Sequence, residues 1–149
     1  MIDTKVIDLV LNALETSEDK FRSSLDKFIK VGIKITNDSE EIMDELQLYE
    51  DLIFHLYITD LDLNIWIKSI NGVLSYNNNL YEIIPENVHA LHSFLSKTTI
   101  AKILRQEMTV AEAYLKGFIQ LEGELSDAII SKNILSLFFS YINYFMKRE

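Results

Sequence analysis

The chain contains no cysteine, one proline and four glycines among its 149 residues. The absence of cysteine excludes disulfides, thiol nucleophiles and zinc–thiolate sites, and it fits a reducing compartment. With so few prolines and glycines and a hydrophobic content of 48%, the sequence is typical of a compact globular domain rather than a disordered chain. We expect a single domain over residues 1–149, because this length is enough to bury a core.

Positive charge is scarce as well, and the formal net charge is −9. Such a charge argues against a nucleic-acid partner and against stable docking on anionic lipid. The stretch from Ile35 to Ile67 holds nine acidic residues and no lysine or arginine. It is a docking face for a basic partner, a weak cation site or an ordinary solvated face. The absence of EF-hand spacing favours the solvated face.

No secretory or membrane-spanning segment is predicted. Residues Met1 to Asp8 include acids where a signal peptide requires basic residues followed by a long apolar core. No apolar run approaches the roughly 18 residues that span a bilayer. We therefore expect a cytoplasmic protein with no stable membrane insertion.

Sequence motifs for catalysis are also missing, since the chain has no GxSxG, no Walker loop and no HExxH. His89 and His92 are three residues apart on an expected strand, so their side chains face opposite ways, which is wrong for sharing a metal ion. The third histidine, His55, lies on a separate expected strand. We expect a protein that is not an enzyme and that uses no cofactor and no bound metal.

The most informative stretch of the chain runs from residue 108 to residue 128. Thr109 is a suitable N-cap, and Glu112 completes a capping box for a short helix. Gly117 is expected to end that helix in a left-handed conformation, which glycine adopts without a Cβ penalty. Residues Phe118 to Glu122 then alternate in polarity, which predicts a half-buried strand.

Gly123 ends this strand, and Glu124 stands where a further helix would begin. The order helix, glycine, alternating strand, glycine, acidic residue and helix resembles the late signature of the sterol carrier protein 2 family. The resemblance covers roughly residues 52–130 and leaves residues 1–50 and the last helix weakly covered or uncovered. It implies a five-stranded sheet with helices on one side and an apolar cavity between them. The matching positions are Ala113, Tyr114, Gly117, Ile119, Leu121, Gly123, Glu124 and Ala128.

Before this stretch, the spacing of apolar residues changes along the chain. Helical spacing predicts amphipathic helices over Asp3–Leu14 and Phe21–Ile29, and Ser39 is expected to cap an acidic helix. Between these helices, Ile33 and Ile35 alternate with polar residues and suggest a marginal strand.

From Leu52 onward the period is two, which indicates strands. The dipeptide Asn71-Gly72 predicts a type I′ hairpin between two of them, because that turn needs positive φ at both central residues. The residues after Asn79 either form a further strand or leave the sheet. Expected strands are Leu52–Ile58, Leu63–Ile70, Val73–Tyr76 and Val88–Leu95, with Leu80–Ile84 as the optional one and a helix over Ile100–Gln106.

Segregated strands and helices indicate the α+β class. We expect a single, mainly antiparallel five-stranded sheet, or six strands if Leu80–Ile84 joins it, with helices covering one face. Residues 1–50 would supply N-terminal helices and a linker, and residues 51–130 the sheet and the signature. Residues 131–149 would form a terminal helix that is apolar on almost every face. Unless it is simply a very apolar part of the core, its surplus surface must meet a ligand, a partner or a second subunit.

Together with the resemblance, these patterns predict a carrier that binds a fatty acid, an acyl chain or a sterol-like lipid between sheet and helices. The alternative is a packed interaction module that forms a homodimer through the terminal helix and binds no lipid. No lysine or arginine is obviously placed to bind a carboxylate. Apolar residues of the central strands and of the helices are expected to line the cavity: Phe54, Leu56, Ile65, Ile67, Ile100, Ile103, Leu104, Met108, Tyr114, Leu137, Phe138 and Tyr141.

Overall fold

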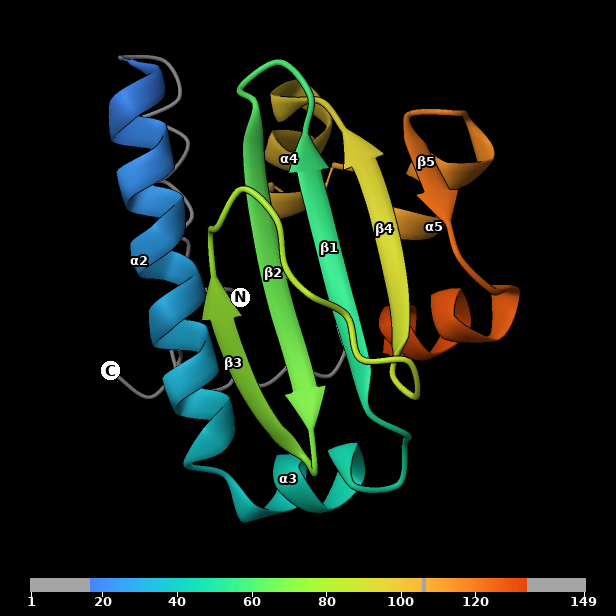
Figure 1. Cartoon of the computed structure of the whole chain (residues 1–149). Helices are drawn as coiled ribbons and strands as arrows, with labels where there is room; N and C mark the ends of the chain where they lie inside the picture. The colour runs from blue at the N-terminus through green and yellow to red at the C-terminus, as the bar shows by residue number, and fades with distance from the viewer. Residues whose placement is uncertain (1–16, 106, 134–149) are drawn as a thin grey trace.

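The computed structural model describes residues 17–105 and 107–133 (Figure 1). The predicted helix over Asp3–Leu14 lies outside these residues, and so does the predicted terminal helix over 131–149 except for its first three positions. After the last strand, residues 125–133 are helical. The elements before them are α2 (Glu18–Asn37), α3 (Glu40–Leu46), β1 (Leu52–Ile58), β2 (Leu63–Ile70), β3 (Val73–Asn77), β4 (His89–Leu95), α4 (Lys97–Leu104), α5 (Val110–Leu115) and β5 (Ile119–Glu122).

The sheet has five strands in the order β3-β2-β1-β4-β5. Three of its pairs, β1–β2, β2–β3 and β4–β5, are antiparallel, whereas β1 and β4 at its centre run parallel. The sheet is therefore mixed, and the expectation of a mainly antiparallel sheet needs this correction. Alternating polarity indicates which face of a strand is buried. It does not indicate which strand pairs with it, or whether the two strands run parallel or antiparallel.

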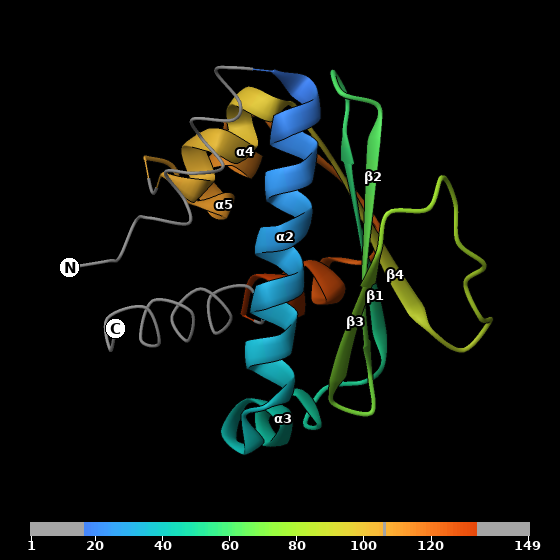
Figure 2. The same ribbon diagram turned by 90° about the vertical axis from the view of Figure 1, so that its left-hand side faces the viewer.

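The helices and the sheet form two layers. Figure 2 shows α2, α4 and α5 on one side of the sheet and the segment 78–88 on the other. The alternation of the strands decides which side chains meet the helices: Leu52 and Ile58 of β1 belong to the core, together with Phe21 and Leu25 of α2. The α+β class and helices over one face are thus confirmed for the described residues.

Helix α2 is longer than the sequence predicted, and the marginal strand at Ile33 and Ile35 is wrong. Ser17 caps the helix by accepting a hydrogen bond from the backbone N–H of Lys20 at 3.1 Å. The buried residues continue at helical spacing to Ile33 and Thr36, so a stripe of five turns outweighs a two-residue alternation. Ser39 caps α3 as predicted, because its hydroxyl accepts from the N–H of Ile42 at 3.3 Å.

The hairpin between β2 and β3 has the predicted geometry, with φ values of 52° at Asn71 and 79° at Gly72. Residues Leu80–Ile84, by contrast, do not form a sixth strand. Their segment crosses the outer face of the sheet, where the Trp66 Nε1–H donates to the carbonyl of Asn79 at 2.9 Å and Lys68 pairs with Glu82 at 2.9 Å. These side-chain contacts replace a strand ladder.

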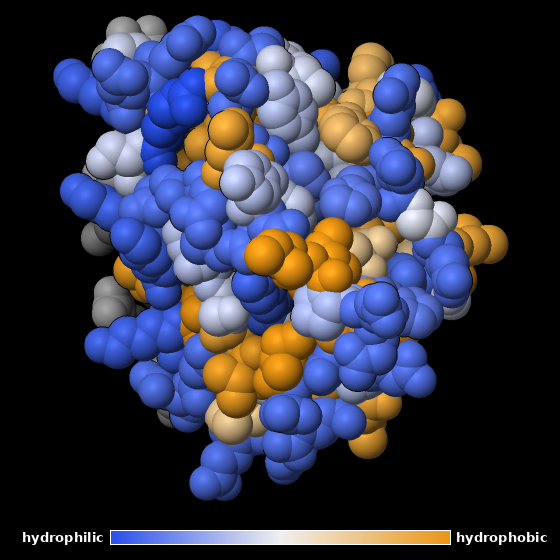
Figure 3. All heavy atoms as spheres, viewed as in Figure 1, coloured by the Kyte–Doolittle hydropathy of each residue, from blue (hydrophilic) through white to orange (hydrophobic). Residues whose placement is uncertain are grey.

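The outer face of the sheet is not uniformly polar. Figure 3, which views this face, shows hydrophobic side chains standing among hydrophilic ones. The segment 78–88 contributes three of the exposed apolar residues: Leu80, Tyr81 and Ile83, which are 74%, 75% and 85% exposed.

The signature stretch folds as its residues predict. The Thr109 hydroxyl accepts a hydrogen bond from the N–H of Glu112 at 3.1 Å and starts α5. Gly117 has a φ of +80° and redirects the chain into β5. Strand β5 joins the same sheet as β2 through β4 and β1, with Ile119 in the core and Leu121 packed against it. The predicted strand and its buried face are both confirmed.

Candidate functional site

A cavity of about 150 Å³ lies between the sheet and the helices. Its floor comes from the inward positions of β1, β2, β4 and β5, and its other walls come from α2, α4, α5 and the helix 125–133. Of the described lining residues, only Ser93, Ser131 and Lys132 carry polar side chains. The apolar ones are Leu25, Phe28, Ile29, Leu56, Ile65, Ile67, Leu91, Leu95, Ile100, Ile103, Leu104, Val110, Ile119, Leu121 and Ala128.

The local sequence explains why these side chains converge. Ile65 and Ile67 are two apart on β2, so they share the face of the sheet that turns toward the helices. Ile100 and Leu104 are four apart on α4, and the Ser96 hydroxyl caps this helix by accepting from the N–H of Thr99 at 3.2 Å. Strand period and helix period therefore place two sets of aliphatic side chains on opposite sides of one space.

Six of the residues predicted from the sequence line this cavity: Leu56, Ile65, Ile67, Ile100, Ile103 and Leu104. Three do not appear among the described lining residues. Phe54 and Met108 are packed in or against the core, and Tyr114 is 48% exposed. Tyr114 turns outward because Ala113, its neighbour on α5, is the residue that faces the interior. Leu137, Phe138 and Tyr141 lie outside the described residues, and a ligand-binding role for any of the twelve stays a prediction.

The cavity also contains residues that the sequence analysis did not predict. Leu25, Phe28 and Ile29 of α2 form part of the wall, although their stripe had indicated only core packing. Lys132 lines the cavity too, although the sequence had offered no lysine obviously placed to bind a carboxylate. The helical register of residues 125–133, which puts Ala128, Ser131 and Lys132 on one side, was the available signal.

A second group of side chains gathers on the opposite face of the sheet. The ring of His55 stacks on Trp66 with centroids 3.8 Å apart, and its Nε2 lies 2.7 Å from Oδ1 of Asn64. Its Nδ1 lies 2.8 Å from Nδ1 of His92. Burial lowers the pKa of His55 and the charge of His92 lowers it further, while the hydrogen bond with Asn64 works in the opposite direction.

A third group lies at one end of β4, where Nδ1 of His89 is 3.0 Å from Oδ1 of Asp127. This hydrogen bond is the main reason why the pKa of His89 is raised, and the negative charge of Asp127 adds to it. Desolvation opposes the rise, and the charges of Glu124 and Glu50 make further, weaker contributions to it. Neither histidine group was predicted, because the sequence suggests a comparison of His89 with His92 alone. Each group brings together residues from separate strands and helices, so no spacing of residues along the chain indicates that they meet.

No helix within the described part of the chain is both long enough and apolar enough to cross a membrane.

Neither a family model nor a curated protein sequence matches the chain. Its fold is nevertheless similar to solved structures. A crystal structure of sterol carrier protein 2 aligns with a TM-score of 0.55 at 11% identity, covering 76% of this chain and 92% of that one. The ubiquinone synthesis protein UbiJ-SCP2 aligns with a TM-score of 0.55 at 6% identity, covering 73% of this chain and 85% of that one.

A double mutant of the sec-alkyl sulfatase PisA1 aligns with a TM-score of 0.50 at 21% identity over 68% of this chain. The chain spans only 14% of the length of that sulfatase. At these identities the likeness shows the fold alone. The domain has a sterol carrier protein 2-like fold, as the signature residues had indicated.

Proposed function

We propose that this domain binds one apolar ligand in the cavity between sheet and helices, and that it carries this ligand without changing it chemically. The observation behind the proposal is the cavity of about 150 Å³ whose described wall is almost wholly aliphatic. Each ligand methylene buried there would contribute about 0.8 kcal/mol. The fold shared with sterol carrier protein 2 supports the same function.

The size of the cavity limits what it holds without rearrangement. An apolar cavity of about this volume accepts a ligand of the size of benzene. A fatty acid or a sterol-like lipid is longer, so the helices or their side chains must move to admit it. Because Ser131 and Lys132 stand in the wall formed by the helix 125–133, a polar head group would emerge on that side. This arrangement favours a fatty acid or another anionic acyl ligand.

Three measurements on the protein as purified from cells test the proposal. Native mass spectrometry should detect a bound lipid, and a fluorescent fatty acid should bind and be displaced by unlabelled fatty acids. A bound fatty acid should also raise the melting temperature by mass action. Displacement by chains of increasing length, from octanoate to palmitate, would show how far the cavity opens.

A matched pair of tryptophan variants separates the proposal from its alternative. Leu104 lines the cavity. Leu46 lies in the core outside the cavity, and only 1% of its surface is exposed. Leu104→Trp should fill the cavity and weaken probe binding at least tenfold while the protein stays stable. Leu46→Trp should overpack a solid core and destabilise the fold by about 1–3 kcal/mol.

The alternative function is an interaction module with a solid interior. In that case no probe binds, and Leu104→Trp destabilises the domain as much as Leu46→Trp does. A dimer found by light scattering, together with those two results, would decide for the interaction module.

A further inference from the structure

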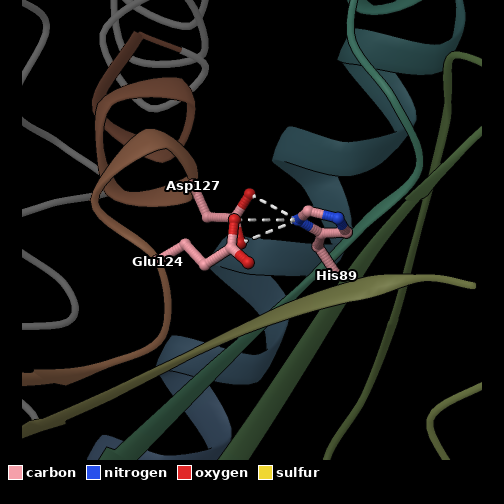
Figure 4. A group of neighbouring side chains, drawn as sticks. All are labelled: His89, Glu124 and Asp127. Carbon is pink, nitrogen blue, oxygen red and sulfur yellow. Dashed lines mark hydrogen bonds and ion pairs between the residues drawn. The ribbon is translucent and has the colours of Figure 1, made fainter. Parts of the chain in front are cut away.

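A histidine and two carboxylates from distant parts of the chain converge at the start of β4. Figure 4 shows the side chains of His89, Glu124 and Asp127 pointing toward one another. Nδ1 of His89 lies 3.0 Å and 3.1 Å from the two oxygens of Asp127 and 3.9 Å from Oε2 of Glu124. One donor atom from each residue lies within 4.8 Å of the others. We propose that these three residues bind one divalent transition-metal ion, such as Zn²⁺.

The fold brings the donors together through a close approach of two backbones. A Cβ added at Gly123 would lie 2.9 Å from Cδ1 of Leu91 and 3.1 Å from the carbonyl oxygen of Ala90. The turn before the helix 125–133 therefore packs directly on β4 beside His89. Glu124 and Asp127 are three residues apart at the start of that helix, which places both carboxylates on the side that faces the histidine.

The separations fit a shared ion. Zinc binds imidazole nitrogen and carboxylate oxygen at about 2.0–2.2 Å, so two donors on one ion are roughly 3.0–3.5 Å apart. His89 and Asp127 already have that separation. Glu124 lies 3.9 Å from His89, and its donor atom is within 4.8 Å of both partners, so it needs to move by about 1–2 Å at most. Its side chain is 70% exposed and can make this movement. An imidazole donor favours a transition metal over Mg²⁺ or Ca²⁺, which prefer oxygen ligands only.

Charge and burial support the same assignment. Asp127 is 5% exposed, and a buried carboxylate is costly unless a partner compensates it. Glu124, which is exposed to water, adds a second carboxylate to the cluster, so the cluster attracts a cation more strongly than His89 and Asp127 alone would. A divalent ion would balance both carboxylate charges and would leave at least one coordination position for water.

The ion would act as a clamp between the sheet and the wall of the cavity. Asp127 directly precedes Ala128, and His89 lies two residues before Leu91; both of these neighbours line the cavity. Metal binding would therefore hold the helix 125–133 against β4 whether or not the cavity contains a lipid. This inference departs from the expectation of a metal-free protein and does not rest on the proposed lipid function.

The alternative is a tether, that is, a hydrogen bond between His89 and Asp127 that holds the helix against β4 without a metal ion. The role of Glu124 differs between the tether and the metal site, so a Glu124 variant distinguishes them. In a tether, the exposed Glu124 contributes little because the bond joins His89 to Asp127. In a metal site, Glu124 is a ligand. Glu124→Gln should therefore leave the melting temperature in EDTA unchanged but lower the affinity for Zn²⁺ at least tenfold.

The experiment uses the full chain without a histidine tag, stripped with EDTA and then equilibrated with Zn²⁺, Mn²⁺, Mg²⁺ or Ca²⁺. Equilibrium dialysis with elemental analysis should give one Zn²⁺ per chain, with a raised melting temperature and much weaker effects of Mg²⁺ and Ca²⁺. His89→Gln and Asp127→Asn should abolish binding. Glu86→Gln and His92→Gln, which lie outside the cluster, should bind Zn²⁺ as the unmodified chain does.

Three results would overturn the proposal. They are the absence of Zn²⁺ binding, equal binding by Glu124→Gln and the unmodified chain, and loss of binding in His92→Gln. The second result would mean that only an adventitious ion is bound. The third would place the ion on the outer face of the sheet.

Discussion

Nδ1 of His55 lies 2.8 Å from Nδ1 of His92, and the two residues are direct partners across the parallel strands β1 and β4. Two ring nitrogens at this distance share one proton, so one ring must present a lone pair. Because Nε2 of His55 lies 2.7 Å from Oδ1 of Asn64, that nitrogen is assigned the proton and donates to the amide oxygen. Nδ1 of His55 is then the acceptor from His92, which requires a neutral His55.

We predict that His55 makes a contribution that destabilises the domain in mild acid, whereas His89, whose pKa is raised, contributes in the opposite sense. Burial lowers the pKa of His55 in the folded state, with a further lowering by His92, whereas the unfolded value is about 6.5. Above that pH both states are neutral and His55 contributes no pH dependence. Below it the unfolded state takes up the proton more readily, so the free energy of unfolding decreases as pH falls.

Urea denaturation between pH 7.5 and pH 5 measures this slope. His55→Phe keeps a ring against Trp66 but cannot titrate, so its stability should depend less on pH over this range. Titratable groups away from His55 are the same in both proteins and cancel in the comparison, so the difference in slope reports on His55 and on His92, which loses its partner in the variant. If stability depends on pH equally in the variant and in the unmodified protein, the pKa of His55 is the same in the folded and unfolded states, and the prediction is wrong.

Gly117 offers a test of backbone strain alone. Its φ is +80°, and a Cβ added there would meet no atom within 4 Å. Gly117→Val should therefore destabilise the domain by about 1–3 kcal/mol through conformation and not through a clash. Gly117→Asn should cost clearly less, because asparagine tolerates the left-handed region. Chemical denaturation gives both values, and an unchanged midpoint for the valine variant would contradict the prediction.

Local features of the fold were predictable from the sequence, and long-range ones were not. Asn71-Gly72 and the alternation of Phe118–Glu122 specify their own conformations, because a turn or a strand face depends on adjacent residues. The parallel pairing of β1 with β4 depends on how the chain returns across the sheet. The two histidine contacts, His55 with His92 and His89 with Asp127, join residues 37 and 38 positions apart.

The cavity was predictable in part for the same reason. Ile65 and Ile67 are on the inner face by alternation alone, so the floor followed from the sequence. The wall supplied by Phe28 depends on where α2 packs on the sheet, which its own amphipathic stripe does not determine. The outward orientation of Tyr114 was not predicted. Helix α5 has only six residues, and so short a sequence does not show which side of the helix faces the interior.

Asn37 is predicted to hold the edge strand β3 against α2. Its side-chain amide donates to the carbonyl of Leu74 at 2.7 Å, and its Oδ1 accepts from the N–H of Leu74 at 2.9 Å. Asn37→Ala should therefore destabilise the domain by about 1–3 kcal/mol, because two partly buried hydrogen bonds are lost. Hydrogen exchange at the Leu74 amide should accelerate more than global stability requires. Asn78→Ala, at an exposed position, is the control and should change neither measurement.

The last prediction concerns Lys132 and depends on the proposed lipid function. Lys132 lines the cavity with its side chain reaching solvent, so its stem can contact a ligand while its ammonium stays in water. If an anionic head group emerges there, Lys132→Gln should weaken the binding of decanoate by about two- to fivefold, since an ion pair open to water contributes at most about 1 kcal/mol. Binding of decanol, which has the same chain and no charge, should not change.

Displacement of a fluorescent probe by the two ligands measures both effects in one assay. Lys116→Gln removes an exposed lysine that does not line the cavity, so it controls for the change in net charge. If Lys132→Gln weakens decanoate and decanol equally, the lysine contributes packing by its methylenes and not charge recognition. If it weakens neither, Lys132 does not recognise the head group, and the prediction is wrong.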